Sequence, residues 1–188
     1  EARCLPIKEV VESFEVFERV RKPMRTAVIA DLCCGHGLVG LLMAAFERRV
    51  EEVHLFDSTI PDNSAQCLAA VARAAPWIDS RIHFHTTSLR RLDEAIPFTS
   101  VLATHACGSL TDQSLEIAAE RGCPVAATPC CYAKRISQAP PVLVRELGLE
   151  RAIDTDRTYR LHAAGYHVRW SYIPEPISPM NRVLIASR

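Results

Sequence analysis

The sequence predicts an α/β fold, a doubly wound and mostly parallel seven-stranded sheet with helices on both faces. Short apolar segments alternate with amphipathic segments of helical length along most of the chain, which is the pattern of successive βαβ units. Connections of this kind place consecutive strands parallel to one another. The last two apolar segments, 166–173 and 182–186, are joined by a proline-rich loop without a helix, so we expect them to pair antiparallel.

Each element is expected from a local pattern. The expected strands are short, apolar and bounded by turn residues, and they cover residues 27–32, 53–56, 81–86, 98–104, 124–128, 166–173 and 182–186. The expected helices repeat apolar residues every three or four positions, over about 7–22, 38–49, 63–75 and 109–121. A further helical region starts at Pro140, is broken near Gly148 and continues as another helix to about Ala164. Pro23 and Pro76 should end the first and third helix, and Gly122 the fourth. Ser109 and Asp112 resemble a capping box at the start of that fourth helix.

Composition indicates one globular domain without a strong electrostatic field. The chain has 188 residues, of which 48% are hydrophobic and 23% charged, and its net charge is +0. Such a balance excludes a protein drawn onto nucleic acid or an anionic membrane by global charge alone. Eight cysteines include two adjacent pairs, which favours free thiols in a reducing, cytoplasmic compartment. Because the first residue is Glu1 rather than Met, we expect trimming from a longer protein, with a flanking domain or partner protein outside this chain. No signal peptide or apolar run of 18 residues is visible, so we expect no membrane association.

A glycine-rich turn follows the first expected strand and leads directly into a helix. Gly35, Gly37 and Gly40 have the spacing G-x-G-x-x-G, which lets the backbone approach a nucleotide-like ligand at a helix N-terminus. Asp31 lies four residues before these glycines and would repel a pyrophosphate. The ligand is therefore expected to carry a positively charged group.

A second acid ends the next apolar segment. Asp57 lies 20 residues after Gly37, at the spacing where an acid meets the hydroxyls of a ribose. The alternative is that Asp57 caps the helix that follows Pro61. The coincidence of strand, acid and spacing favours the role in ribose binding.

The segment from Asp31 to Gly37 resembles motif I of class I S-adenosylmethionine (SAM)-dependent methyltransferases, usually D-x-G-x-G-x-G, with Cys33 in place of the first glycine. The resemblance implies SAM as the cofactor and the strand order 3-2-1-4-5-7-6. It also implies a SAM-binding methyltransferase domain over residues 26–188, preceded by an N-terminal helix over residues 1–25. The residues implied in cofactor binding are Asp31, Cys33, Cys34, Gly35, His36, Gly37, Asp57, Ser58, Ser88, Leu89 and His105.

Cysteines and histidines follow three strands that should be neighbours in this fold. They are Cys33, Cys34 and His36 after the first strand, His105 and Cys107 after the fourth, and Cys130 and Cys131 after the fifth. Three interpretations remain open: small side chains that pack tight strand ends, an acceptor site, or a zinc or copper(I) site. No C-x-x-C spacing occurs, and adjacent cysteines rarely both reach one ion. We therefore expect no metal.

A narrower resemblance concerns the same loops. The pattern His105-x-Cys107-Gly108, the pair Cys130-Cys131 and the closing segment 178–182 are similar to a methyltransferase subgroup. This subgroup includes eukaryotic tRNA acceptor-stem 2′-O-methyltransferases and a set of methyltransferase-like proteins. The resemblance implies RNA modification, with tRNA or rRNA as substrate and RNA as the partner. The alternatives are a small-molecule or protein side-chain acceptor, and a non-catalytic SAM-binding or metal-linked module.

The residues expected to act on the acceptor are His105, Cys130, Cys131 and Tyr132. Histidine is the natural general base because it titrates near neutral pH, and Tyr132 could orient or stack a substrate. A second hypothesis makes Cys130 a nucleophile, as in RNA 5-methylcytosine enzymes. The cations expected either to grip phosphates or to form a solvated face are Lys134, Arg135, Arg145, Arg151, Arg157 and Arg160.

Overall fold

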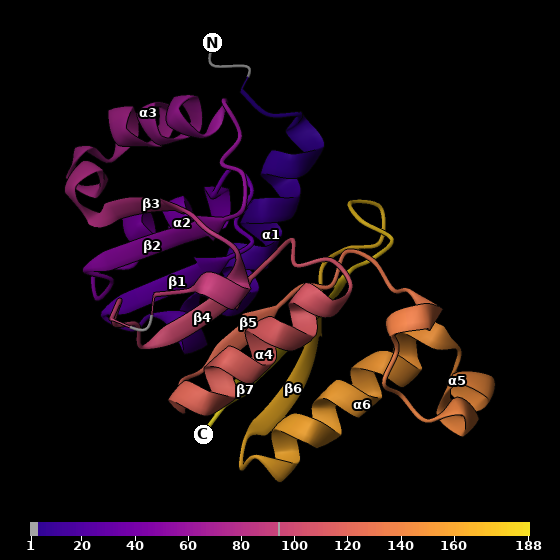
Figure 1. Ribbon diagram of the computed structural model, residues 1–188. Coiled ribbons are helices and arrows are strands. Elements are labelled where there is room, and N and C mark those ends of the chain that lie inside the picture. Colours follow the sequence, from indigo (N-terminus) through magenta and orange to yellow (C-terminus); the bar gives the residue numbers. More distant parts are fainter. Residues whose placement is uncertain (1–3, 94) are drawn as a thin grey trace.

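A seven-stranded mixed sheet forms the centre of the molecule. The structure is a computed structural model that describes residues 4–93 and 95–188 (Figure 1). The strand order is β3-β2-β1-β4-β5-β7-β6, with β1 to β5 parallel and β7 antiparallel to both of its neighbours. This arrangement confirms the expected fold class and strand order. The strands are β1 Val28–Leu32, β2 Glu52–Asp57, β3 Ile82–Thr86, β4 Ser100–Ala103, β5 Val125–Ala127, β6 His167–Tyr172 and β7 Arg182–Ser187.

Helices cover both faces of this sheet. The α-helices are α1 Ile7–Met24, α2 Leu38–Phe46, α3 Ser64–Ala74, α4 Ser109–Arg121, α5 Pro141–Leu147 and α6 Leu149–Ala163. Three short 3₁₀ turns are η1 Pro76–Arg81, η2 Leu89–Arg91 and η3 Lys134–Ile136. In Figure 1, α4 and α6 lie in front of the sheet, and α1 and α2 lie behind it. None of the helices in the described part of the chain is long and apolar enough to cross a membrane.

Two hydrophobic cores result, one on each face of the sheet. The core behind the sheet joins α1 and α2 to β1 and β2, and includes Phe17 and Leu55. The core in front joins α4 and α6 to β1, β4 and β5, and includes Leu32 and Tyr166. Strand β1 supplies side chains to both cores, which is why its sequence reads as a continuous apolar run.

The first helix is part of the rear core. Phe17 is fully buried, and its ring lies 5.6 Å from the ring of Phe46 on α2, measured between centroids. Val20 and Met24 are also fully buried. Burying side chains of this size contributes roughly 1.5–3 kcal/mol each, so α1 is held firmly against the domain.

Several helix boundaries differ from the expected ones. Pro23 lies inside the last turn of α1 rather than after it. It has no N–H to donate to the carbonyl of Arg19, and that carbonyl instead accepts a hydrogen bond from Arg169 at 3.4 Å. Helix α2 ends at Phe46, so the charged residues after it lie outside the helix. The expected capping box is wrong: Ser109 is the first helical residue, Gly108 is the N-cap, and no side chain caps α4. Gly122 is the C-cap of α4 in the left-handed conformation, as expected.

The topology places the ends of four parallel strands together. Strand β1 lies between β2 and β4, and β5 follows β4, so the loops after all of these parallel strands emerge at the same edge of the sheet. The chain leaves β1 toward one face and β4 toward the other. Ligands of open α/β sheets bind at such a switch point.

Gly40 allows α2 to approach β2 closely. A Cβ atom at this position would lie 2.7 Å from Cδ2 of Leu55 and 3.0 Å from Cγ1 of Val53. We expect Gly40→Ala to lower the free energy of unfolding by about 1–3 kcal/mol through overpacking, although alanine is the better helix former. Urea denaturation measures the change. Gln66→Ala on the exposed face of α3 is the control and should change stability by less than about 0.5 kcal/mol. A Gly40→Ala protein as stable as wild type would contradict the close approach.

Candidate cofactor and acceptor site

The loop after β1 keeps the expected shape despite its cysteine. Cys33 has a φ of 55°, the left-handed conformation that a glycine adopts without steric cost. It is the only non-glycine residue with a positive φ in the described part of the chain. For a residue with a Cβ this conformation costs roughly 1–2 kcal/mol. The surrounding loop therefore holds Cys33 in the geometry of the glycine that it replaces.

The two glycines of the loop have different roles. Gly37 has a φ of 76° and is the N-cap of α2, and a Cβ on it would lie 2.7 Å from Cδ1 of Leu55. The absence of a side chain at Gly37 therefore lets the loop pack directly against Leu55 of β2. Gly35 has a φ of 56°, and a Cβ on it would meet no atom within 4 Å. Gly35 thus faces open space, where a ligand could approach the backbone.

Asp31 is a buried carboxylate with one unpartnered oxygen. Its side chain is only 1% exposed, and its Oδ2 accepts a hydrogen bond from the backbone N–H of Gly40 at 3.2 Å. Its Oδ1 is buried without a partner among the described residues. Burial raises the pKa of Asp31 to about 7, and the nearby charge of Asp57 adds to this rise. A cationic group at Oδ1 would relieve both effects.

Asp57 ends β2 and faces the same loop. Its Oδ2 accepts a hydrogen bond from the backbone N–H of Gly35 at 2.9 Å. Its Oδ1 accepts bonds from the backbone N–H of Thr59 at 3.2 Å and from the hydroxyl of Ser58 at 3.4 Å. The alternative role as a helix cap is not seen, because α3 begins at Ser64 and has no side-chain cap. Asp57 is therefore free to offer its remaining lone pairs at the strand ends.

Ser88 and Leu89 follow β3 and differ in environment. Ser88 is exposed and precedes η2. Leu89 is buried in the front core, so only its backbone can contribute to a ligand site. Cys34 is also buried, and its side chain packs in the rear core rather than facing the ligand site.

Two histidines from different loops lie side by side. The ring of His36 and the ring of His105 are 5.9 Å apart between centroids. Nδ1 of His36 accepts a hydrogen bond from the backbone N–H of Leu38 at 3.3 Å, and its Nε2 lies 3.4 Å from a carboxylate oxygen of Glu9 on α1. Burial lowers the pKa of His36, and repulsion from His105 lowers it further. The first loop, the loop after β4 and the first helix thus meet at this point.

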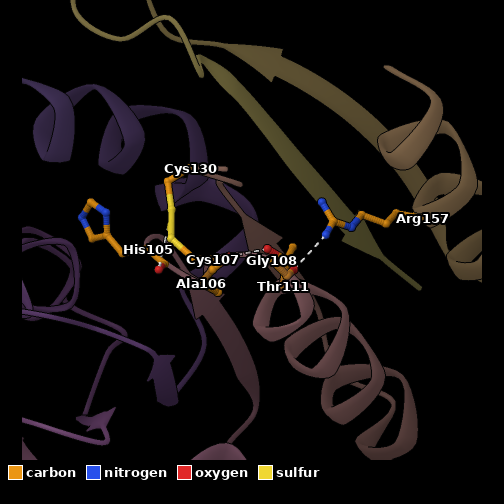
Figure 2. Close-up of a disulfide and its surroundings, with 7 residues drawn as sticks. All are labelled: His105, Ala106, Cys107, Gly108, Thr111, Cys130 and Arg157. Carbon is orange, nitrogen blue, oxygen red and sulfur yellow. Dashed lines mark hydrogen bonds between the residues drawn. A yellow bond between two sulfur atoms is a disulfide. The ribbon is translucent and has the colours of Figure 1, made fainter. Parts of the chain in front are cut away.

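A disulfide joins the loops after β4 and β5. Cys107 and Cys130 are bonded, with a Cα–Cα distance of 5.8 Å and a sequence separation of 23 (Figure 2). The expectation of free thiols is therefore wrong for this pair. The pairing arises because β4 and β5 are parallel neighbours, so the residues that follow them end close together. Figure 2 shows the His105 ring pointing away from the disulfide.

A buried network of charges supports both loops. Arg157 on α6 is 2% exposed and donates hydrogen bonds to Asp112 at 2.9 Å, to Asp154 at 3.1 Å and to the carbonyl oxygen of Gly108 at 3.2 Å. The hydroxyl of Tyr132 donates to Asp154 at 2.6 Å. Arg157 therefore connects the loop after β4 with the loop after β5, and Figure 2 shows its contact with Gly108.

This network corrects three expectations from the sequence. Arg157 is buried among carboxylates, so it neither grips a phosphate nor belongs to a solvated face. Arg160 pairs with Asp112 and Asp156. Burial would raise the pKa of Asp112, but its hydrogen bonds and charge interactions with the two arginines lower it. Asp112 is thus an ion-pair partner rather than a cap. The sequence held no signal for this network beyond the spacing of residues 154 and 157 on one helix face.

Tyr132 is held in its neutral form. Burial raises its pKa above the ordinary value, and the charge of Asp154 and the hydrogen bond to it raise the pKa further. Its hydroxyl is directed to Asp154, which is fully buried. Tyr132 therefore contributes its ring, rather than an ionised hydroxyl, to the loop after β5. We call the loops after β4 and β5 the candidate acceptor loops.

Comparison with known proteins identifies the family. A family model described as a methyltransferase domain matches residues 6–138. The chain belongs to this methyltransferase domain family. No curated protein sequence matches the chain. Its fold is that of the class I SAM-dependent methyltransferases, and SAM is its cofactor.

Solved structures of other methyltransferases share this fold at low identity. An rRNA methylase from Streptococcus thermophilus has a TM-score of 0.55 and 11% identity, over 95% of this chain and 94% of that one. Fibrillarin, a pre-rRNA processing protein of Methanococcus jannaschii, has a TM-score of 0.58 and 12% identity, over 88% and 68%. Human N-acetylserotonin methyltransferase, solved with SAM, has a TM-score of 0.57 and 14% identity, over 97% and 53%. At these identities the likeness concerns the fold alone.

The residues of the first loop fit this cofactor. SAM carries an ammonium and a sulfonium group, and the unpartnered Oδ1 of Asp31 is a buried acceptor for a cation. The space in front of Gly35 admits a ligand close to the backbone. Asp57 would hold the ribose hydroxyls through the lone pairs that its backbone contacts leave free. These assignments of single residues to parts of SAM are predictions.

Replacing Asp31 should stabilise the methyltransferase and weaken SAM binding. Because the folded-state pKa of Asp31 is raised above the unfolded value of 3.8, its ionisation costs stability increasingly from about pH 4 and in full above about pH 7. We expect Asp31→Asn to raise the free energy of unfolding at pH 8 by about 2–4 kcal/mol. The variant and wild type should converge near pH 4.

Calorimetry should show SAM affinity at least ~10-fold weaker for Asp31→Asn, because the cation loses its charged partner. Asp62→Asn, at an exposed acid, is the matched control for both measurements and should leave them unchanged. A stability difference independent of pH would contradict the raised pKa.

Removing Arg157 should destabilise the domain. Arg157→Met removes the buried cation that Asp112 and Asp154 share, although Arg160 still pairs with Asp112 and Arg182 with Asp154. We therefore expect a cost of about 3 kcal/mol, the lower end of the range for breaking a buried pair. Urea denaturation at pH 7 measures the loss. Arg145→Met removes an exposed arginine from the neighbouring helix α5 and should change stability by less than about 0.5 kcal/mol. Equal effects of both variants would show that the network contributes nothing specific.

Proposed function

We propose that this methyltransferase transfers the methyl group of SAM to RNA, with tRNA or rRNA as the substrate class. The observation that carries the proposal is a set of exposed cations next to the strand ends. Lys134 and Arg135 lie on η3, directly after the Tyr132 loop, and Arg90 and Arg91 lie on η2, directly after β3. Within residues 4–93 and 95–188, none of the four forms an ion pair with a carboxylate. Exposed cations on two sides of a site suit a phosphate backbone.

The proposal assigns roles in SAM binding and methyl transfer to individual residues. SAM supplies an electrophilic methyl group when bound. Asp31 and Asp57 hold it at the ends of β1 and β2, with Ser58 beside Asp57 and Ser88 at the end of β3. His105 is half-buried after the end of β4, and in this proposal it would accept the proton of the attacking group. Cys130 is bonded to Cys107, which speaks against a nucleophilic role for its sulfur in this state.

The known structures are consistent with this proposal without deciding it. The Streptococcus thermophilus protein is an rRNA methylase and fibrillarin is a pre-rRNA processing protein, whereas the human enzyme is an N-acetylserotonin methyltransferase. One fold therefore serves acceptors of very different size. The exposed cations near the strand ends, rather than the fold, favour RNA.

Transfer of labelled methyl groups tests the proposal. We expect protein incubated with methyl-labelled SAM and a cell extract to label RNA, with the label sensitive to ribonuclease. The double variant Lys134→Glu/Arg135→Glu should lose about 10-fold or more of this activity at physiological salt, because two phosphate contacts are lost. Its affinity for SAM should be unchanged by calorimetry.

The matched control reverses the same amount of charge at the opposite edge of the sheet. Arg48→Glu/Arg49→Glu lies in the exposed loop before β2 and should methylate RNA at the wild-type rate. Label found only in protein or in small molecules would overturn the RNA substrate. SAM binding without transfer to any fraction would indicate a non-catalytic module instead.

A further inference from the structure

Three cysteine sulfur atoms meet between the loops after β4 and β5. The Sγ atoms of Cys107, Cys130 and Cys131 all lie within 4.8 Å of one another. They form the one group of three or more potential metal ligands within the described part of the chain. A disulfide requires only two of these sulfurs, and Cys131 is a free cysteine. The third sulfur therefore needs an explanation of its own.

The distances suit a tetrahedral zinc ion. Zinc–thiolate bonds are about 2.3 Å long, so two sulfurs on a tetrahedral ion lie about 3.8 Å apart. Because the three sulfurs lie within 4.8 Å of one another, small rotations of their side chains bring them to this spacing once the disulfide is reduced. The sequence argument against a metal was that adjacent cysteines rarely both reach one ion. That argument does not hold here, because Cys130 and Cys131 both lie near Cys107.

The two loops that carry the sulfurs are held in place independently of the disulfide. The carbonyl oxygen of Gly108, next to Cys107, accepts a hydrogen bond from Arg157, and the hydroxyl of Thr111 donates to the carbonyl of Ala106 (Figure 2). Tyr132, next to Cys131, is fixed by its bond to Asp154. A site assembled before the ion arrives loses less entropy on binding.

We propose that in the reduced protein Cys107, Cys130 and Cys131 form a three-thiolate zinc site. Soft thiolates select zinc over harder divalent ions. The group holds no fourth protein ligand among the described residues, and Cys107 is exposed, so a water molecule would complete the coordination. Three protein ligands with one open position are the arrangement of zinc sites that contact a substrate. The inference rests on this geometry and not on the proposed RNA substrate.

The zinc site and the disulfide exclude each other, because both use the sulfur atoms of Cys107 and Cys130. Reduction by a phosphine, with one water molecule, breaks the S–S bond and yields the two thiols of Cys107 and Cys130 together with the phosphine oxide. Zinc then binds the three sulfurs as thiolates and releases their protons. Either occupant ties the loop after β4 to the loop after β5.

Zinc titration of the phosphine-reduced protein tests the site. We expect one zinc per chain by equilibrium dialysis and metal analysis, with the affinity measured against a chromophoric chelator. Cys131→Ser should weaken zinc binding by more than ~100-fold, beyond the 10–100-fold typical of residues that only support a ligand. The same variant should still form the Cys107–Cys130 disulfide when oxidised, which shows that it is folded. Cys4→Ser, outside the site, is the control and should bind zinc as wild type does.

A measurement without substitutions gives a second readout. Zinc should protect Cys107, Cys130 and Cys131 from alkylation in the reduced wild-type protein, while Cys33 and the other cysteines react at unchanged rates by mass spectrometry. The proposal is overturned if the reduced protein binds no zinc, if Cys131→Ser binds zinc as tightly as wild type, or if other cysteines are protected instead. None of these results bears on SAM binding or RNA labelling, so the two proposals fail separately.

Discussion

The close approach of the first loop to β2 is the constraint on which the site depends. Gly37 and Gly40 lack side chains where Leu55 packs against them, so α2 begins directly beside β2. This contact aims the N–H of Gly40 at Asp31 and the N–H of Gly35 at Asp57. Both carboxylates are thereby oriented by the backbone of a single turn. A larger side chain at Gly37 or Gly40 would move the loop after β1 away from Asp31 and Asp57.

The charges in this turn favour the binding of a cationic ligand but lower the folding stability of the ligand-free protein. Asp31 is buried with an unsatisfied oxygen and lies near a second acid, which raises its pKa to about 7. Cys33 occupies a conformation that costs an L-residue free energy. Both features destabilise the isolated protein, and a cationic ligand compensates the first. Functional sites commonly retain such unfavourable features because a ligand resolves them.

The acceptor side is organised differently, by contacts between distant segments. Arg157 and Asp154 on α6 hold Gly108 after β4 and Tyr132 after β5. The disulfide joins the same two loops at a second point. Because these ties come from α6 and from sulfur chemistry rather than from the sheet, the acceptor loops can be fixed even though they follow short strands. Three sulfur atoms at their junction give the loops a means of responding to zinc or to oxidation.

The sequence alone determined the elements whose signal is local. Apolar alternation predicted the strands, the glycine spacing with Asp31 predicted the first loop, and the position of Asp57 at the end of β2 predicted the second acid, because each depends on neighbouring residues and on backbone geometry. Resemblance to a known family added the strand order and the cofactor. Only the tertiary structure decided the partners of Asp112, Arg157 and Tyr132 and the pairing of Cys107 with Cys130. Apart from the pair Asp154 and Arg157 on one turn of α6, those contacts join residues that lie more than 20 positions apart. No local pattern specifies which distant side chain will share a buried space.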